Sequence, residues 1–298
     1  MIRTPITPRT IGGGLTAFAV AAYLGGLAAD PRGAARPGAP ESRPIATGSV
    51  AAAPVPARQE ECTRFGARGP QQNPHQSFYF TRGAYSSSPW SWRGRSWATD
   101  YPKADQQFVY VMQRTLDWDI YGCENPIRLD DPHLRRFPFL YVLEVGAMGL
   151  TDPEVEGLRN YLLSGGFLFV DDFWGPAEWE NFEREIARVL PGHDLEEIPM
   201  DHLIFRIIYP IAEVLQVPNV QRGETGNPAY YGECYYGASC PATVRGIFDD
   251  DGRLMVVAAH NSDLGDAWEW AERPRYPFDR SNFAFSLAFN VIAYAMVY

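Results

Sequence analysis

The sequence predicts an α/β fold: one globular domain with a mainly parallel sheet and helices on both faces. Two short apolar runs, Phe139–Val145 and Phe167–Val170, lack polar alternation, as strands covered on both faces do. Between them, Thr151 and Glu154 form a capping-box pattern before an amphipathic stretch that ends at Gly165–Gly166. This order predicts a parallel β-α-β unit with a right-handed crossover.

Apolar spacing, caps and turn residues predict the other elements of the domain. In chain order they are a strand at Ser77–Phe80, a helix over about Pro102–Trp118, a strand at Ile127–Leu129, a helix over Ala177–Leu190, a hairpin of Val244–Phe248 with Arg253–Ala259, and a helix over Asn282–Tyr298 capped by Ser281. The last helix is apolar on nearly all sides, which predicts that it is buried.

Two segments precede the domain, which is expected to span residues 77–298. Within residues 1–30, Arg3 and Arg9 stand before the apolar run Ile11–Ala29, as in a secretory signal or a membrane anchor. The run approaches the roughly 20 residues of a spanning helix, which favours an anchor. The positive-inside rule then places the rest on the periplasmic side of the inner membrane, anchored or secreted. Residues 31–76, rich in Pro, Ala and Gly, are expected to form an extended arm.

Charge is distributed unevenly along the chain. Residues 1–70 carry eight Arg and four acidic residues, whereas residues 71–298 carry 18 basic and 32 acidic residues. Phosphate contacts require Lys and Arg, so such an acidic domain is not expected to bind nucleic acid.

The four cysteines form no C-x-x-C pair, which argues against a zinc ribbon or a thioredoxin-like motif. Cys234 and Cys240 flank a short loop that a disulfide could close in an oxidising compartment. The alternative is two buried free thiols.

An aromatic loop follows the first predicted strand. It holds Trp90, Trp92 and Trp97 together with Arg93 and Arg95. One interpretation is that the indoles cover the sheet. The other is an interface with a partner protein, because Trp and Arg are common among residues that dominate binding energy.

From about Phe78 to Tyr298 the sequence resembles domain-of-unknown-function family 4159. The motifs that carry the resemblance are Thr99–Pro102, Phe137–Tyr141, Leu158–Leu162, Gly165–Gly166, Asp171–Asp172, Asp201–His202, His260–Trp268 and Asn290. The resemblance implies a flavodoxin-like fold of the class I glutamine-amidotransferase-like superfamily, and no established activity. That superfamily places a cysteine nucleophile after the strand that follows Gly-Gly, where this chain has Asp171–Phe173. Amidotransferase chemistry is therefore not expected.

Acidic and histidine side chains at predicted strand ends form a candidate site. They are Asp171, Asp172, Asp201, His202, His260 and Asp263. If they converge, a carboxylate beside a histidine could act as a general base or bind a divalent metal. The alternative is structural: Asp172 caps a helix or binds backbone amides, and Asp201–His202 is a hydrogen-bonded pair.

These features favour a non-catalytic, membrane-anchored extrinsic protein. It is expected to bind or stabilise a larger inner-membrane complex, for example respiratory or photosynthetic, or another envelope protein, from the exported side. No cofactor and no metal are expected. The alternative is an exported hydrolase that uses the Asp/His cluster, with or without a metal, on sugar or peptide material of the envelope. Convergence of the six side chains in one pocket would favour the hydrolase.

Overall fold

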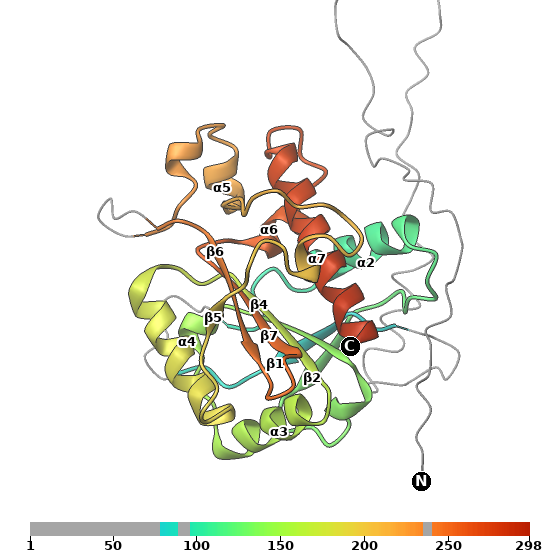
Figure 1. Cartoon of the computed structure of the whole chain (residues 1–298). Helices are drawn as coiled ribbons and strands as arrows, with labels where there is room; N and C mark the ends of the chain where they lie inside the picture. The colour runs from blue at the N-terminus through green and yellow to red at the C-terminus, as the bar shows by residue number, and fades with distance from the viewer. Residues whose placement is uncertain (1–77, 89–95, 235–239) are drawn as a thin grey trace, which may run out of the picture. The chain divides into compact units, whose positions relative to one another are not determined.

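The structure is a computed structural model that describes residues 78–88, 96–234 and 240–298. In this part of the chain seven strands form one mixed sheet, in the order β2-β1-β3-β4-β7-β6-β5 (Figure 1). The strands are β1 (Thr81–Ala84), β2 (Asn125–Arg128), β3 (Phe139–Leu143), β4 (Phe167–Asp171), β5 (Glu196–Glu197), β6 (Thr243–Phe248) and β7 (Leu254–His260). The sheet confirms the predicted α/β class.

Five of these strands, β2, β1, β3, β4 and β7, are mutually parallel, whereas β6 pairs antiparallel with β7 and β5 pairs antiparallel with β6. The two apolar runs became β3 and β4, which pair in parallel with Phe139 opposite Phe167. They are inner strands, as predicted. Taken in chain order, the parallel strands are arranged 2-1-3-4-5, so the chain reverses direction across the sheet between β1 and β3. In such sheets ligands bind at the carboxyl ends of strands near this reversal.

Helices cover both faces of the sheet (Figure 1). They are α2 (Lys103–Thr115), α3 (Asp152–Leu163), α4 (Gly175–Val189), α5 (Val220–Gly223), α6 (Leu264–Glu269) and α7 (Phe278–Val297), with 3-10 turns η3 (Leu134–Arg136), η4 (Val145–Ala147), η5 (Leu203–Phe205) and η6 (Pro228–Tyr230). Side chains of β3 alternate between two cores: Tyr141 packs with α2, α6 and α7, whereas Leu140 and Val142 pack with α3 and α4. The apolar runs of β3 and β4 follow from burial on both faces.

Local sequence signals mark the start of α3 and the turn between β6 and β7. The capping box of α3 is formed: the Thr151 hydroxyl accepts a hydrogen bond from the Glu154 amide, and the Glu154 carboxylate accepts one from the Thr151 amide. The β6–β7 hairpin is present, and its turn is held by the Asp249 carboxylate, which accepts from the amides of Asp251 and Arg253. Both features confirm the sequence-based prediction.

Two predicted starts were wrong by four residues, a larger difference than at the other predicted starts. The first strand is Thr81–Ala84 rather than Ser77–Phe80, because a buried ion pair allows Arg82 to lie inside the sheet. The last helix begins at Phe278, and Ser281 lies within it, where its hydroxyl donates to the Ala267 carbonyl. The serine therefore ties α7 to α6 instead of capping α7.

None of the helices within residues 78–88, 96–234 and 240–298 has the length and apolarity needed to cross a bilayer. The predicted anchor in residues 1–30 and the arm in residues 31–76 lie outside the described residues.

Candidate functional site

Asp171 ends β4 and is completely buried. Its Oδ2 accepts hydrogen bonds from the amides of Leu264, at 2.7 Å, and Gly265, at 3.2 Å. These are the first amides of α6, and their partial positive charge favours a carboxylate. Asp171 thus joins the end of β4 to the start of α6.

Carboxylates from three separated segments meet beside Asp171. Asp172 follows β4, Asp263 follows β7, and Asp100 lies in the turn before α2; each offers an oxygen within 4.8 Å of the other two. Asp266 and Glu269, on α6, form a second set of the same kind with Asp100. We call these five residues the acidic edge cluster. Within the described residues, these are the groups at this edge that could hold a metal ion, and all their donor atoms are oxygens.

Strained backbone surrounds the acidic edge cluster. Within the described residues, the non-glycine positions with left-handed φ are Asp100 (60°), Glu144 (55°), Asp172 (50°) and Asn261 (59°). Glu144, Asp172 and Asn261 directly follow β3, β4 and β7, and Asp100 lies before α2 with a carboxylate oxygen close to that of Asp172. Asp and Asn tolerate such backbone better than other non-glycine residues. Backbone strain of this kind concentrates at functional sites.

Burial and mutual repulsion raise the pKa values of the buried carboxyls. Burial raises the pKa of Asp171 to about 7, although contacts with Tyr141, the Leu264 and Gly265 amides and Arg82 act in the opposite direction. The pKa values of Asp172 and Asp263 lie well above the usual range, first through burial and then through neighbouring carboxylates. At neutral pH the edge therefore needs protons or a cation to offset its charge.

His260, the last residue of β7, does not face these acids. Its ring packs against Phe173 and Trp179, with centroids 4.8 and 4.9 Å away. Its Nε2 lies 3.1 Å from the Gly175 carbonyl oxygen, and its Nδ1 lies 3.4 Å from Nδ2 of Asn261. This arrangement assigns the proton to Nε2, which donates to Gly175, and leaves Nδ1 as the acceptor. Both ring nitrogens are occupied, so His260 is not placed as a base for the cluster.

The packing of His260 predicts an acid-sensitive contribution to stability. Burial lowers its pKa to about 4, with a smaller lowering from Arg245 and an opposing hydrogen bond to Gly175. Between pH 6.5 and 4 the unfolded chain binds more protons at this residue, so stability is lost as pH falls. From pH 7 to 5 we expect wild type to lose about 1 kcal/mol more than His260→Gln, since partial exposure weakens the effect. Urea unfolding at both pH values measures the difference, and equal losses would contradict the assignment.

Asp201 and His202 lie at the opposite edge of the sheet. With Pro199, Leu203, Arg206, Asp251, Gly252, Arg253, Tyr294 and Tyr298 they line a shallow pocket. The β6–β7 turn at Asp251 precedes β7, so this pocket is at the amino end of that strand. His202 Nδ1 accepts from the Ile204 amide, and its ring contacts Tyr294. The six predicted site residues therefore do not converge: Asp171, Asp172 and Asp263 lie together, His260 faces away from them, and Asp201 and His202 are elsewhere.

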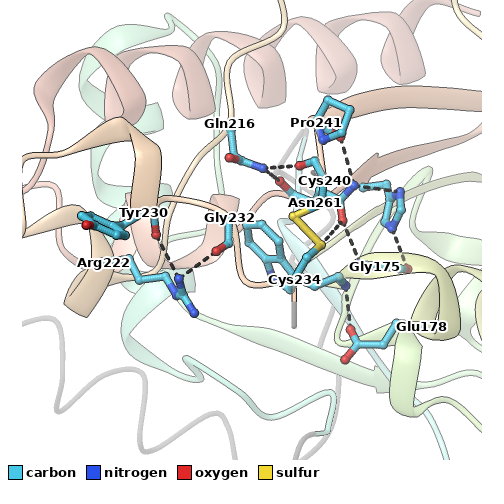
Figure 2. Close-up of a disulfide and its surroundings, with 12 residues drawn as sticks. Gly175, Glu178, Gln216, Arg222, Tyr230, Gly232, Cys234, Cys240, Pro241 and Asn261 are labelled. Atoms are coloured by element: carbon cyan, nitrogen blue, oxygen red, sulfur yellow. Dashed lines mark hydrogen bonds between the residues drawn. A yellow bond between two sulfur atoms is a disulfide. The ribbon is translucent and has the colours of Figure 1, made fainter. Parts of the chain in front are cut away.

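Cys234 and Cys240 form a disulfide with Cα atoms 6.1 Å apart (Figure 2). Asn261 links this disulfide to the sheet: its Oδ1 accepts from the Gly175 amide at 2.8 Å and lies 3.7 Å from Cys234 Sγ. Its Nδ2 donates to the Pro241 carbonyl at 3.0 Å. The bridge thus fastens the loop between α5 and β6 to the carboxyl edge of the sheet, next to the turn after β4.

Loss of the bridge is expected to lower stability. It closes a loop with a sequence separation of 6 residues. The restriction of the unfolded chain by so short a loop predicts a loss of about 2 kcal/mol for Cys234→Ser with Cys240→Ser. Urea unfolding under non-reducing conditions measures this loss. Intact mass after alkylation of the native protein without reductant is the control: two more labelled thiols in wild type than in the double variant would refute the bridge.

The returning end of the aromatic loop is held by a buried arginine. Trp90, Trp92, Arg93 and Arg95 lie outside the described residues. Arg82 donates to the carbonyls of Trp97 and Thr99, both at 3.1 Å, and is paired with Asp105. The Trp97 ring lies 5.7 Å from that of Tyr101 and packs partly against the core. Of the five predicted interface residues, Trp97 therefore stands where the loop rejoins the rigid domain.

Sequence reasoning did not identify Asp100, Glu269 or the Arg82–Asp105 pair. Asp100 lies within the Thr99–Pro102 motif that carried the family resemblance, and that motif was the available signal. Asp105 lies on the amphipathic helix α2, where a charged residue ordinarily indicates a solvent-facing side, and Glu269 is the last residue of the short helix α6. Only the packing of α2 and α6 against the sheet brings them inward.

Comparison with known proteins gives one family. Residues 84–296 match the family model described as Domain of unknown function (DUF4159). A comparison with curated proteins returns no match. The matched range includes β2 to β7, α2 to α6, the acidic edge cluster and the disulfide. On this match, the chain belongs to the DUF4159 family.

Proposed function

We propose that this chain is a non-catalytic, membrane-anchored extrinsic protein that binds and stabilises a larger inner-membrane protein complex from the exported side. The aromatic loop supplies the contact, and residues 1–30 supply the anchor. The observation that carries the proposal is that buried Arg82 holds the returning end of the aromatic loop. The buried Arg82 guanidinium fixes the carbonyls of Trp97 and Thr99, so the loop returns to a rigid base. A fixed base lowers the entropy cost of presenting aromatic side chains to a partner.

The arrangement of polar side chains supports a role without catalysis. Cys234 and Cys240 are joined in a disulfide, so neither offers a thiolate. The turn after β4, where the family resemblance would place a cysteine nucleophile, holds Asp172 and Phe173. His202 lies at the opposite edge of the sheet from Asp172, so these two do not form an acid–base pair.

Two further features support the exported location and the superfamily. Disulfides persist in oxidising compartments such as the periplasm, which agrees with the export expected from residues 1–30. The parallel strand order 2-1-3-4-5 is that of flavodoxin-like sheets. We therefore also propose that the domain belongs to the class I glutamine-amidotransferase-like superfamily and uses the fold as a binding scaffold.

The proposal is tested by extracting the protein from the membranes of its own cells in mild detergent. It is expected to migrate in native electrophoresis with one large membrane complex, whose subunits mass spectrometry identifies. A high-salt wash without detergent should leave the protein on the membrane if it is anchored. Migration as a monomer, in every mild detergent tried, would refute the partner.

An exported hydrolase is the alternative, and one observation favours it. Asp100, Asp172 and Asp263 approach one another closely enough to hold a metal ion, which could activate a water molecule. Hydrolysis would also need a group that transfers protons to the substrate. His260 is occupied by Gly175 and Asn261. Turnover of envelope sugars or peptides that falls at least about 100-fold in Asp172→Asn would favour this alternative.

A further inference from the structure

Three segments that are distant in sequence place carboxylates around one point at the carboxyl edge of the sheet. Asp100 precedes α2, Asp172 follows β4 and Asp263 follows β7, with one oxygen of each within 4.8 Å of the others. Asp172 and Asp263 are buried, at 7% and 4% exposed. Carboxylates at such distances repel strongly in a buried setting unless something positive lies between them.

Orphaned polar atoms at the same place form a second observation. Asp171 and Tyr141 are both completely buried. Asp100 Oδ2 is a buried atom without a hydrogen-bond partner within the part of the chain that the structure describes, and Asp171 Oδ1 and the Tyr141 hydroxyl interact with each other but meet no further partner there. A Cβ added to Gly265 would lie 2.7 Å from Asp100 Oδ2 and 3.3 Å from the Tyr141 hydroxyl, so both atoms face the start of α6. Buried polar atoms left without partners indicate an ion or water that completes the site.

Among the residues that the structure describes, two cations near this edge, Arg82 and Lys103, have other partners. Arg82 is paired with Asp105, and Lys103 is paired with Glu272 and lies over the Trp270 ring.

We propose that Asp100, Asp172 and Asp263 together bind one calcium ion. All the donors are oxygens, which suits a hard cation and not zinc or copper. Calcium binds oxygen at 2.3–2.6 Å, and three oxygens that lie within 4.8 Å of one another can reach one such ion together. Magnesium prefers about 2.0–2.1 Å and an octahedron that keeps several waters. The sequence led us to expect no metal, because Asp100 is about 70 and 160 residues from the other two ligands and only the fold brings them together.

The proposed ion would join the turn before α2 to the turns after β4 and β7. Calcium binding at this site goes beyond the proposed function and does not depend on the identity of a membrane partner. Thermal unfolding of the full chain, in mild detergent and without reductant, tests it. Relative to excess chelator, calcium at roughly 100 times its Kd is expected to raise Tm by about 5–10 °C, and magnesium by less.

Conservative variants locate the effect. In Asp172→Asn the new side chain tolerates the same left-handed backbone and can still accept the Trp174 indole hydrogen bond. Asp263→Asn keeps an N-cap for α6, where Asp263 accepts from the Asp266 amide. Each is expected to abolish the calcium shift and to raise Tm in chelator, because one buried charge has been removed. Asp201→Asn, at the opposite edge, is the control and should keep the full shift.

A second measurement does not require unfolding. Terbium takes calcium sites and emits when a nearby tryptophan is excited, and the Trp174 indole donates to Asp172. Wild type should give terbium emission that calcium displaces, and Asp172→Asn and Asp263→Asn should lose at least about nine-tenths of it. Absence of both the calcium shift and the emission in wild type would overturn the proposal. So would a shift or emission that persists in both variants, since the ion would then lie elsewhere.

Discussion

Replacing Arg82 with methionine is expected to lower the free energy of unfolding by about 3–5 kcal/mol. Arg82 and Asp105 are both completely buried, and Arg82 Nε donates to the two carboxylate oxygens at 2.9 and 3.0 Å. Removing the arginine leaves the Asp105 carboxylate buried and uncompensated. Burial already raises the pKa of Asp105, and the Arg82 charge opposes that rise. Urea unfolding at neutral pH measures the loss.

A double variant separates the ion pair from the loop contacts of Arg82. Arg82→Met with Asp105→Leu removes both charges and should recover most of the stability, because apolar pairs replace buried ion pairs at little cost. The carbonyls of Trp97 and Thr99 lose their donor in both variants. If the double variant is no more stable than Arg82→Met, the loss comes from those loop contacts and the ion-pair explanation is wrong.

Trp268→Ala is expected to lower stability by about 3–5 kcal/mol. The indole is completely buried and packs against Phe108, Tyr141 and Phe80, with ring centroids 4.6, 5.1 and 6.1 Å away. It fastens α6, which carries part of the acidic edge cluster, to the sheet and to α2. Trp270→Ala is the matched control: this partly exposed ring lies beneath Lys103, and its loss should cost about 1 kcal/mol. Urea unfolding measures both losses. Equal losses for the two variants would contradict the conclusion that the buried Trp268 indole fastens α6 to the sheet.

Much of the fold could be predicted because local patterns and tertiary packing agree. The apolar runs of β3 and β4 match burial on both faces, and the capping box of α3 forms as expected. The prediction of the first strand failed because a charged residue, Arg82, is buried within β1. Arg82 reads as a strand end in the sequence, yet Asp105, 23 residues later, allows it to lie in β1. Such a pairing depends on how α2 packs, which no local pattern contains.

The candidate site was predictable only in part, for a topological reason. Asp171 ends β4, Asp172 follows it, and Asp263 follows β7, the parallel neighbour of β4. Because the carboxyl ends of parallel strands meet at one edge of a sheet, the approach of these three residues to one another could be predicted. Asp201 and His202 lie at the amino end of β7, and the sequence does not reveal which edge a connecting segment reaches. Asp100 belongs to a turn before α2, and the left-handed backbone at this residue was not visible in the sequence.

Binding of a membrane complex through the aromatic loop is the central claim, and co-purification yield from native membranes tests it most directly. Trp90→Ala with Trp92→Ala is expected to lower the yield of partner subunits at least about 10-fold, because interface tryptophans commonly contribute 2 kcal/mol or more each. Replacing residues 31–76 with a Gly-Ser linker, while keeping the anchor, should lower it as well if the arm makes contacts beyond tethering. Tyr230→Ala, at an exposed tyrosine outside the loop, is the control and should leave the yield unchanged. Undiminished yield from both the tryptophan variant and the linker variant would contradict the claim.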